Sequence, residues 1–164
     1  MADLSVDLST AGIRIGFCIE TTAGTMPTSG YTNIPKPKEI PDMNPEPNGL
    51  ETSSLNIPAG GYKTYTPGLK DMGGSLGITF GMSDVFAEAW NDMCDDAATA
   101  LADGKKCWFT FYHPGRTKSL FITGIPSKVY FPAASVDEVW DCTAYITPTG
   151  EPTMATAVNP TDPS

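Results

Sequence analysis

Residues Gly73–His113 read GGSLGITFGMSDVFAEAWNDMCDDAATALADGKKCWFTFYH and contain a strand pattern, a helix pattern and a second strand pattern. From Leu76 to Met82, apolar residues alternate with small residues, which is the two-residue period of a half-buried strand. Ser83 supplies a hydroxyl for a helix N-cap, and Asp84 places a carboxylate at the positive end of the helix dipole. This stretch therefore predicts a strand, one helix and another strand, in that order.

The predicted helix runs from Asp84 to about Asp103. Its apolar residues recur at spacings of three and four, as on the buried stripe of an amphipathic helix. The stripe contains Phe86, Trp90, Met93, Ala97 and Leu101, and it is widened by Val85, Ala89 and Cys94. Gly104 can adopt the left-handed conformation that commonly ends a helix. Burying the four largest side chains of the stripe is worth roughly 6–12 kcal/mol before conformational entropy is subtracted, so we expect helix docking to be decisive.

Similar patterns predict strands in other parts of the chain. The strand patterns cover residues 12–21, 50–57, 107–112, 119–125, 128–131 and 136–147. Pro126 interrupts one β run, so the segment 128–131 is expected to be bulged or to lie at a sheet edge. About seven strands and one helix predict a mainly β fold, a β-sandwich or partial barrel with one flanking α-helix.

The length of 164 residues fits one domain that is large enough to bury a core. We expect a flexible N-terminal arm at residues 1–11, the β domain at 12–152 and a flexible C-terminal tail at 153–164. Within the domain, residues 22–49 contain six prolines, which predicts a long irregular loop.

Apolar residues within the proline-rich loop suggest that it packs onto a surface. Tyr31, Ile34, Ile40 and Met43 are the candidate anchors. They favour an extended, surface-packed loop over plain disorder, although the sequence leaves both possibilities open.

The chain is acidic, with ten basic against nineteen acidic residues and a net charge of −9. Ordinary nucleic-acid binding is disfavoured, because such proteins neutralise phosphates with basic patches. An acidic surface still suits a protein that stays near DNA without binding it. The first ten residues lack the pattern of a signal peptide, and no apolar run approaches the roughly 20 residues of a membrane helix, so no membrane insertion is expected.

The four cysteines, Cys18, Cys94, Cys107 and Cys142, are scattered and form no C-x-x-C pair. Three fall in predicted strands and one in the predicted helix. We therefore expect buried free thiols and no metal site, which weakly favours synthesis in a cytosol.

No catalytic constellation is visible. His113, the one histidine, lies beside Pro114 with no nucleophile pattern around it, which favours a turn histidine over a general base. Asp92, Asp95 and Asp96 fall on the polar face of the helix without the spacing of a calcium loop. The glycine pairs lack the lysine of a phosphate-binding loop. We expect no enzyme activity and no cofactor.

The ordered set of elements resembles the major tail tube protein of long-tailed (siphophage, lambda-like) bacteriophages. The resemblance covers roughly residues 12–155 and rests on the order of several features rather than on one motif. These features are the turn-rich segment 62–71, the segment Gly74–Phe80, the helix after Ser83, the segment Trp108–Tyr112, the strand pair 119–131, the strand 137–147 and the closing segment Ile146–Pro152.

The resemblance implies a β-sandwich with a flanking helix that forms hexameric rings, whose inner strands join into one continuous barrel. Stacked rings would form a hollow tube in the virion tail, through which genomic DNA passes without specific binding. Implied partners are further copies of the chain and the tape-measure, tail terminator and baseplate proteins. The protein would be made in the cytoplasm of the host bacterium.

Two sets of residues are candidates for the lumen of such a tube. One is the small face Ser75, Gly77, Thr79 and Gly81, and the alternative is Asp137, Asp141 and Thr143. The sequence does not choose between them. Candidates for contacts between rings or subunits are Tyr31, Ile34, Ile40, Met43, Tyr62, Tyr65, Leu69 and Asp71.

Other functions remain open at this stage. Within the same structural class, the chain could be another tail or head–tail joining protein, or a subunit of a secretion tube, since type VI secretion tube proteins and baseplate hub components share the fold. In a different class, a β-barrel ligand-binding module could use Tyr62, Tyr65, Trp108 and Tyr112 to bind a glycan or a peptide.

Overall fold

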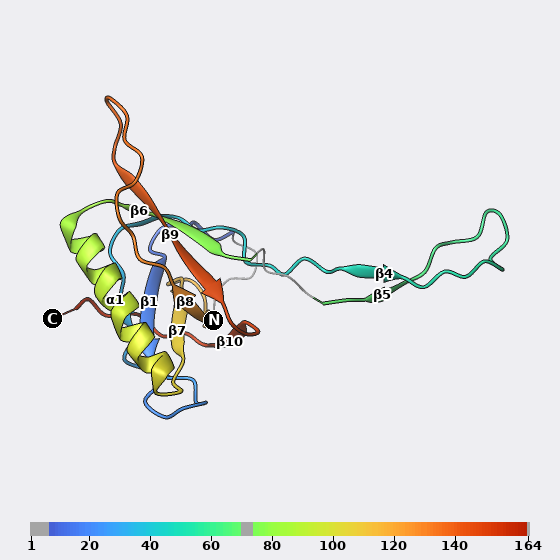
Figure 1. Cartoon of the computed structure of the whole chain (residues 1–164), viewed down its shortest axis with the longest axis horizontal. Coiled ribbons are helices and arrows are strands. Elements are labelled where there is room, and N and C mark those ends of the chain that lie inside the picture. The colour runs from blue at the N-terminus through green and yellow to red at the C-terminus, as the bar shows by residue number, and fades with distance from the viewer. Residues whose placement is uncertain (1–6, 70–73, 164) are drawn as a thin grey trace.

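The computed structural model describes residues 7–69 and 74–163, and these residues form ten strands and one helix (Figure 1). The strands before the helix are β1 (Arg14–Ile19), β2 (Thr32–Asn33), β3 (Pro37–Glu39), β4 (Gly49–Glu51), β5 (Tyr65–Pro67) and β6 (Leu76–Gly81). The helix is α1 (Asp84–Ala102), and the strands after it are β7 (Cys107–Tyr112), β8 (Lys118–Pro126), β9 (Asp141–Pro148) and β10 (Thr153–Thr156).

Eight of the strands form one antiparallel sheet in the order β2-β1-β7-β8-β9-β6-β3, with β10 also paired to β8. The long strand β8 links two halves of this sheet. Its first part pairs with β7 and β10, and its last residues, Gly124–Pro126, pair with β9. The sheet therefore wraps into a half-barrel with one helix beside it. The expected mainly β fold with a single flanking helix is confirmed.

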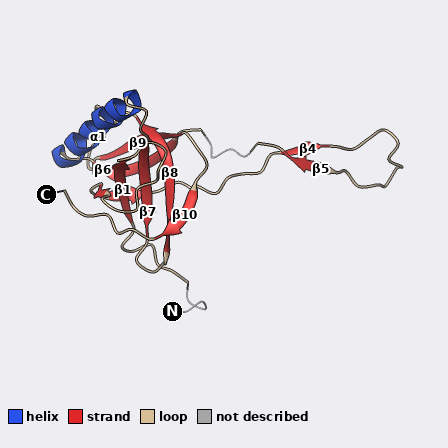
Figure 2. Cartoon of the chain, turned by 90° about the horizontal axis from the view of Figure 1, so that it is seen from below, coloured by secondary structure: helices blue, strands red, loops and turns tan. Residues whose placement is uncertain are grey.

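Helix α1 packs over the apolar side of the sheet (Figure 2). The ring of Phe86 stacks on that of Phe80 in β6, with centroids 4.7 Å apart, and Trp90 lies 5.5 Å from Phe80. All three side chains are at most 1% exposed. The apolar alternation of β6 and β9 faces this helix, since Ile78, Ala144 and Ile146 are also buried.

The predicted ends of the helix are confirmed. The Ser83 hydroxyl accepts a hydrogen bond from the Phe86 N–H at 3.2 Å, so Ser83 is the N-cap. Gly104 has a φ of 75°, the left-handed conformation expected after the last turn.

The prediction of which helix residues are buried is wrong at the edges of the apolar stripe. Leu101 is 56% exposed and Val85 is 69% exposed, whereas Ala100 is buried. The buried positions advance by four, three, four and three residues from Phe86 to Ala100, which keeps them on one line facing the sheet. Leu101 lies one position beyond that line and points to solvent.

The proline-rich segment 22–49 contributes to the core, which corrects the prediction of a surface loop. Tyr31 and Ile34 are only 1% and 5% exposed, and Tyr31 packs against Phe121 with ring centroids 5.6 Å apart. Strands β2 and β3 pair with β1 and β6. Proline excludes central strands but not short strands at a sheet edge, where an N–H group can be missing.

The C-terminal segment is ordered, and the expected flexible tail is wrong for the residues that the structure describes. β10 pairs with β8 over four residues. Beyond it, the Thr161 N–H donates to the Tyr31 carbonyl at 3.0 Å, and the Asn33 N–H donates to the Thr161 carbonyl at 2.7 Å. These are main-chain bonds, so a sequence without an apolar pattern can make them. Of the expected N-terminal arm, residues 1–6 lie outside the described part.

The segment 127–140 is not a strand, although the sequence predicted one at 128–131 and another beginning at Val136. It forms a projecting loop, here called the finger, and β9 begins only at Asp141. No strand of the described chain lies beside the finger, so the alternating residues have no ladder to join. Its base is held by side chains of α1 instead: Trp90 Nε1 donates to the Ser127 carbonyl at 2.8 Å.

Glu20 is a buried carboxylate, 2% exposed, at the end of β1. It accepts hydrogen bonds from the Lys106 N–H at 2.7 Å, the Gly24 N–H at 3.2 Å and Trp108 Nε1 at 3.1 Å. Burial alone would raise the pKa of this carboxyl, but the three hydrogen bonds outweigh it and lower the pKa below its usual value. Glu20 therefore joins β1 to the start of β7 as an ionised group.

A first prediction concerns the helix contact. Replacing Trp90 by alanine should lower the free energy of unfolding by about 3–5 kcal/mol, because it removes a buried aromatic side chain and leaves a cavity. Leu101→Ala, on the exposed side of the same helix, should cost less than about 1 kcal/mol. Urea denaturation followed by circular dichroism measures both values. Equal losses in the two variants would contradict this packing.

A second prediction concerns pH. A carboxyl whose pKa is lowered on folding stabilises the fold above its unfolded pKa of 4.5, and this contribution is lost as the pH falls through the folded value. Glu20→Gln should therefore unfold more easily than the native chain at pH 7, and the difference between the two should shrink below pH 4.5. The exposed Glu151→Gln is the control. A difference that stays constant from pH 7 to pH 3 would refute the role of Glu20.

Candidate functional site

The exposed side of β6 and β9, here called the polar face, brings together most of the predicted lumen residues. The two strands pair in the register Gly77↔Tyr145, Thr79↔Thr143 and Gly81↔Asp141. Side chains directly across an antiparallel pair lie on the same side of the sheet. The alternative sets Ser75–Gly81 and Asp141–Thr143 are thus one surface.

The polar face is small and carries hydroxyl groups. The hydroxyls of Thr79 and Thr143 lie 3.4 Å apart, as do those of Ser75 and Thr147. At Gly77 an added Cβ would come 3.0 Å from the Tyr145 ring, so the missing side chain makes room for that ring. Apart from Lys36 and Lys38 at its Gly81 end, the described residues of this surface offer no cation to a nucleic acid.

Two of the predicted lumen residues are placed differently from the rest. Gly81 is covered, because the side chains of Lys36 and Lys38 lie over it. Asp137 is not on the polar face: it lies in the finger with a φ of 61°. The sequence prediction requires a continuous strand that includes Asp137, but β9 begins four residues later, at Asp141. The Asp141 carboxylate pairs with Lys38 Nζ at 2.6 Å.

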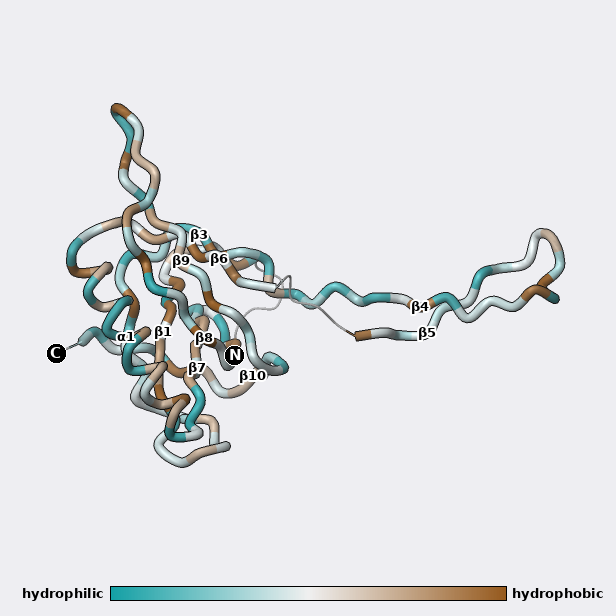
Figure 3. The backbone as a smooth tube through the Cα atoms, in the orientation of Figure 1, coloured by the Kyte–Doolittle hydropathy of each residue, from teal (hydrophilic) through white to brown (hydrophobic). Residues whose placement is uncertain are grey.

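The hairpin of β4 and β5, here called the arm (residues 48–68), projects far from the sheet (Figures 1 and 3). Its base is closed by a bond from the Gly68 N–H to the Asn48 carbonyl at 2.6 Å. Leu55 is fully exposed, and the other exposed large side chains of the arm and its base are Leu50, Tyr62, Tyr65 and Leu69. An isolated two-stranded hairpin is marginally stable in water, so apolar side chains in this position favour contact with a partner.

The predicted contact residues that the structure describes therefore divide into three groups. Tyr62, Tyr65 and Leu69 are exposed at the arm, whereas Tyr31 and Ile34 are core residues and cannot contact a partner in this conformation. Their burial in the subunit overrides the prediction made from the loop composition. Ile40 and Met43 are partly buried against the core, and Asp71 lies outside the described residues.

Sequence reasoning missed the finger as an exposed surface. Tyr130, Phe131, Val136 and Val139 are each at least 75% exposed. Figure 3 shows apolar segments close to the tips of both the finger and the arm. The sequence contains part of the signal for a loop here, because Pro132 and the small residues after it interrupt the strand pattern.

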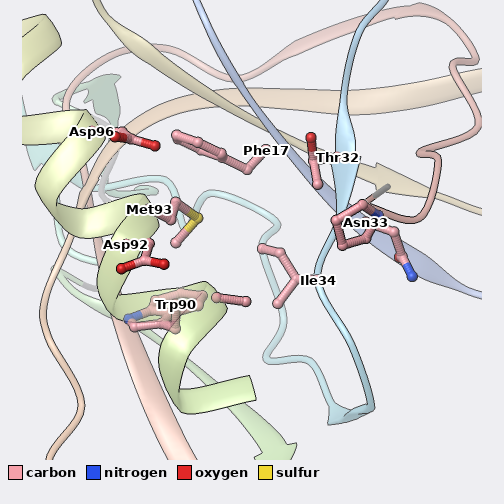
Figure 4. Close-up of a pocket in the computed structure, with 10 residues that line it drawn as sticks. Phe17, Thr32, Asn33, Ile34, Trp90, Asp92, Met93 and Asp96 are labelled. Atoms are coloured by element: carbon pink, nitrogen blue, oxygen red, sulfur yellow. The ribbon is translucent and has the colours of Figure 1, made fainter. Parts of the chain in front are cut away.

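A pocket of about 280 Å³ lies between α1 and the strands β1 and β2 (Figure 4). Phe17, Ile34, Trp90 and Met93 form its apolar part, and the carboxylates of Asp92 and Asp96 lie at its helix side. The third acid of the predicted polar helix face, Asp95, pairs with Lys128 at 2.8 Å. Among the described residues no three His, Cys, Asp or Glu side chains are grouped to hold a metal ion.

The thiols are free, as predicted. Cys94, Cys107 and Cys142 are buried and Cys18 is half-buried. Burial raises the pKa of the Cys94 and Cys107 thiols to about 11, so both are protonated at neutral pH. Protonated, buried thiols are poor nucleophiles.

His113 is a turn histidine, as predicted. Its Nδ1 accepts a hydrogen bond from the Gly115 N–H at 2.9 Å, and its Nε2 contacts the Ser9 carbonyl. Since Nδ1 is an acceptor, Nε2 carries the proton and donates to Ser9. In the described part of the chain, no helix is long and apolar enough to span a membrane.

The four aromatic residues considered for ligand binding do not form one surface. Tyr62 and Tyr65 belong to the arm, which lies far from β7 (Figure 1). Trp108 in β7 is tied to Glu20 through its indole N–H. The structure therefore gives no shared aromatic platform to a glycan or peptide.

Comparison with known proteins finds no matching family model and no matching curated protein. Among solved structures, a chain of the anti-feeding prophage baseplate, from a six-fold symmetrised cryo-EM structure, is similar with a TM-score of 0.59. The two chains share one fold. Their sequences are 10% identical, and the match covers 93% of this chain and 98% of the baseplate chain. A match over nearly all of both chains at such low identity shows a common architecture.

Proposed function

We propose that this chain is the structural subunit of a bacteriophage tail tube, in which six copies form a ring and stacked rings form a hollow conduit for the genome. The observation that carries the proposal is the common fold with a chain of a six-fold symmetrised prophage baseplate, over 93% of this chain. The role follows from that likeness together with the surfaces described above, and it requires no catalytic group.

The open sheet supports ring formation. Among its described strands, β3 and β10 each pair with one neighbour only, whereas β2 is already bonded to Thr161 on its outer side. Much of β6 is left without a neighbour on its outer side, because β3 pairs with it only near Thr79 and Phe80. Unpaired edges invite pairing with another chain, and a barrel closed across several copies removes them.

The polar face suits a lumen. Its small hydroxyl-bearing side chains present little that would hold a phosphate. Of the two lysines at its Gly81 end, Lys36 and Lys38, the second is paired with Asp141. The whole chain carries a net charge of −9. A channel wall of this kind lets DNA slide, because it releases few counterions on contact.

The arm suits a contact between rings. It extends beyond the body of the subunit (Figure 2). Its side chains Leu55, Tyr62 and Tyr65 are exposed. In a stack of rings it would reach a neighbouring copy and bury these side chains. Tape-measure, tail terminator and baseplate proteins are the further partners expected in a virion tail, with synthesis in the cytoplasm of the host.

A second candidate within the same class is a ring component of a baseplate or of another part of the tail. The observation that favours it is that the structurally similar chain belongs to a baseplate. A ring that does not stack would have this role, whereas a tube subunit stacks on itself.

A third prediction separates these candidates. Negative-stain microscopy of the purified full chain should show rings and hollow tubes. A variant in which residues 50–66 are replaced by a two-glycine linker should form rings without tubes, because Gly49 and Pro67 are neighbours in the hairpin and the shortened loop leaves the core intact.

Thermal unfolding of the shortened variant is the control, and its midpoint should stay within a few degrees of that of the full chain. Single rings from the full chain would favour the baseplate candidate. A monomer at every concentration, and in the presence of tail partners, would contradict the proposal.

A further inference from the structure

The finger exposes an apolar tip with two adjacent acids. Val136 and Val139 are 88% and 75% exposed, and Asp137 and Glu138 lie between them. Neither acid forms an ion pair within the described residues. Exposed apolar side chains that lie close together often mark a contact with a partner.

The finger is held in shape rather than loose. At its base, Asn91 on α1 makes two hydrogen bonds with the main chain of Val129. Its Nδ2 donates to the Val129 carbonyl at 3.1 Å, and its Oδ1 accepts from the Val129 N–H at 3.0 Å. Further out, Trp140 donates to the Pro132 carbonyl at 3.3 Å and meets Phe131 edge-on, with ring centroids 4.9 Å apart. A loop that is already ordered loses less entropy when it binds.

A groove of about 480 Å³ elsewhere on the subunit has the opposite charge. Its apolar walls come from Ile40, Met43, Phe111, Leu120 and Met154, and here it is called the basic groove. Arg116 and Lys118 line it at the turn between β7 and β8. Both are exposed, and neither makes an ion pair within the described part of the chain.

We propose that the finger tip of one copy docks into the basic groove of a second copy. Val136 and Val139 would enter the apolar part of the groove, and Asp137 and Glu138 would face Arg116 and Lys118. Two acids then meet two bases, around a shared apolar contact. A second copy of the chain carries both the complementary charge and the apolar surface that the groove requires, so we take it as the occupant.

The contact joins two different surfaces, so it is head-to-tail. Each copy keeps one free finger and one free groove, and such contacts close into rings or continue as filaments. The inference rests on the proposed assembly of copies and adds one specific contact to it. The pairing of sheet edges and the reach of the arm are independent of it.

The test is a zero-length carbodiimide crosslink between carboxyl and amine groups, in a mixture of ¹⁴N- and ¹⁵N-labelled full-length chains. Mass spectrometry should find Asp137 or Glu138 joined to Lys118 in peptides that combine both isotopes. Charge reversal of the finger (D137K with E138K) or of the groove (R116E with K118E) should each lower the yield of mixed oligomers by about tenfold.

Mixing the finger-reversed variant with the groove-reversed variant should restore the oligomers, since each then offers the other a complementary surface. The control variant, E88K with D103K, makes the same change of charge as the finger reversal at an exposed residue of α1 and at its C-cap, and it should assemble as the native chain does. Rings or tubes that form without the Asp137/Glu138–Lys118 crosslink would overturn this contact and leave the proposed function standing. Absence of any assembly would overturn both.

Discussion

The contact between helix α1 and strand β6, through Phe80, Phe86 and Trp90, determines which side of the sheet is buried. Their rings form one cluster, with Phe80 stacked on Phe86 at 4.7 Å. A single helix covers only one side of a curved sheet. The other side of β6 and β9 must then be compatible with water, and its residues are glycine, threonine, serine, Tyr145 and a paired aspartate. The strict alternation of β6 places each kind of residue on its proper side.

This division gives the molecule three separate surfaces with different physical properties. The polar face carries small hydroxyl-bearing side chains, the arm and the finger carry apolar side chains outward, and the basic groove combines apolar walls with Arg116 and Lys118. A monomer with so many exposed apolar groups on projecting loops would be prone to association. In the proposed tube, association is the function, and the net charge of −9 opposes unspecific binding of the genome.

Much of the core could be predicted from sequence because it depends on local periodicity. The helix, its Ser83 cap, Gly104 and the buried sides of β6 and β9 all follow from spacing. The predictions fail where main-chain pairing or contact with a distant segment determines the structure. Tyr31, Ile34 and the C-terminal strand β10 are held by contacts with distant segments, and no local pattern encodes them. The finger continues the alternation of β9, but no described strand pairs with it, so the alternation predicts the wrong surface for Asp137.

The likeness to the baseplate chain concerns the fold alone, and the proposed orientation of the polar face toward a channel rests on the residues of that face. The most direct measurement is a cryo-EM reconstruction of particles formed by the full chain. We predict rings of six copies in which Thr79 and Thr143 face a continuous central channel. A reconstruction in which these two residues lie on the outer surface, or in which no channel is present, would contradict this account.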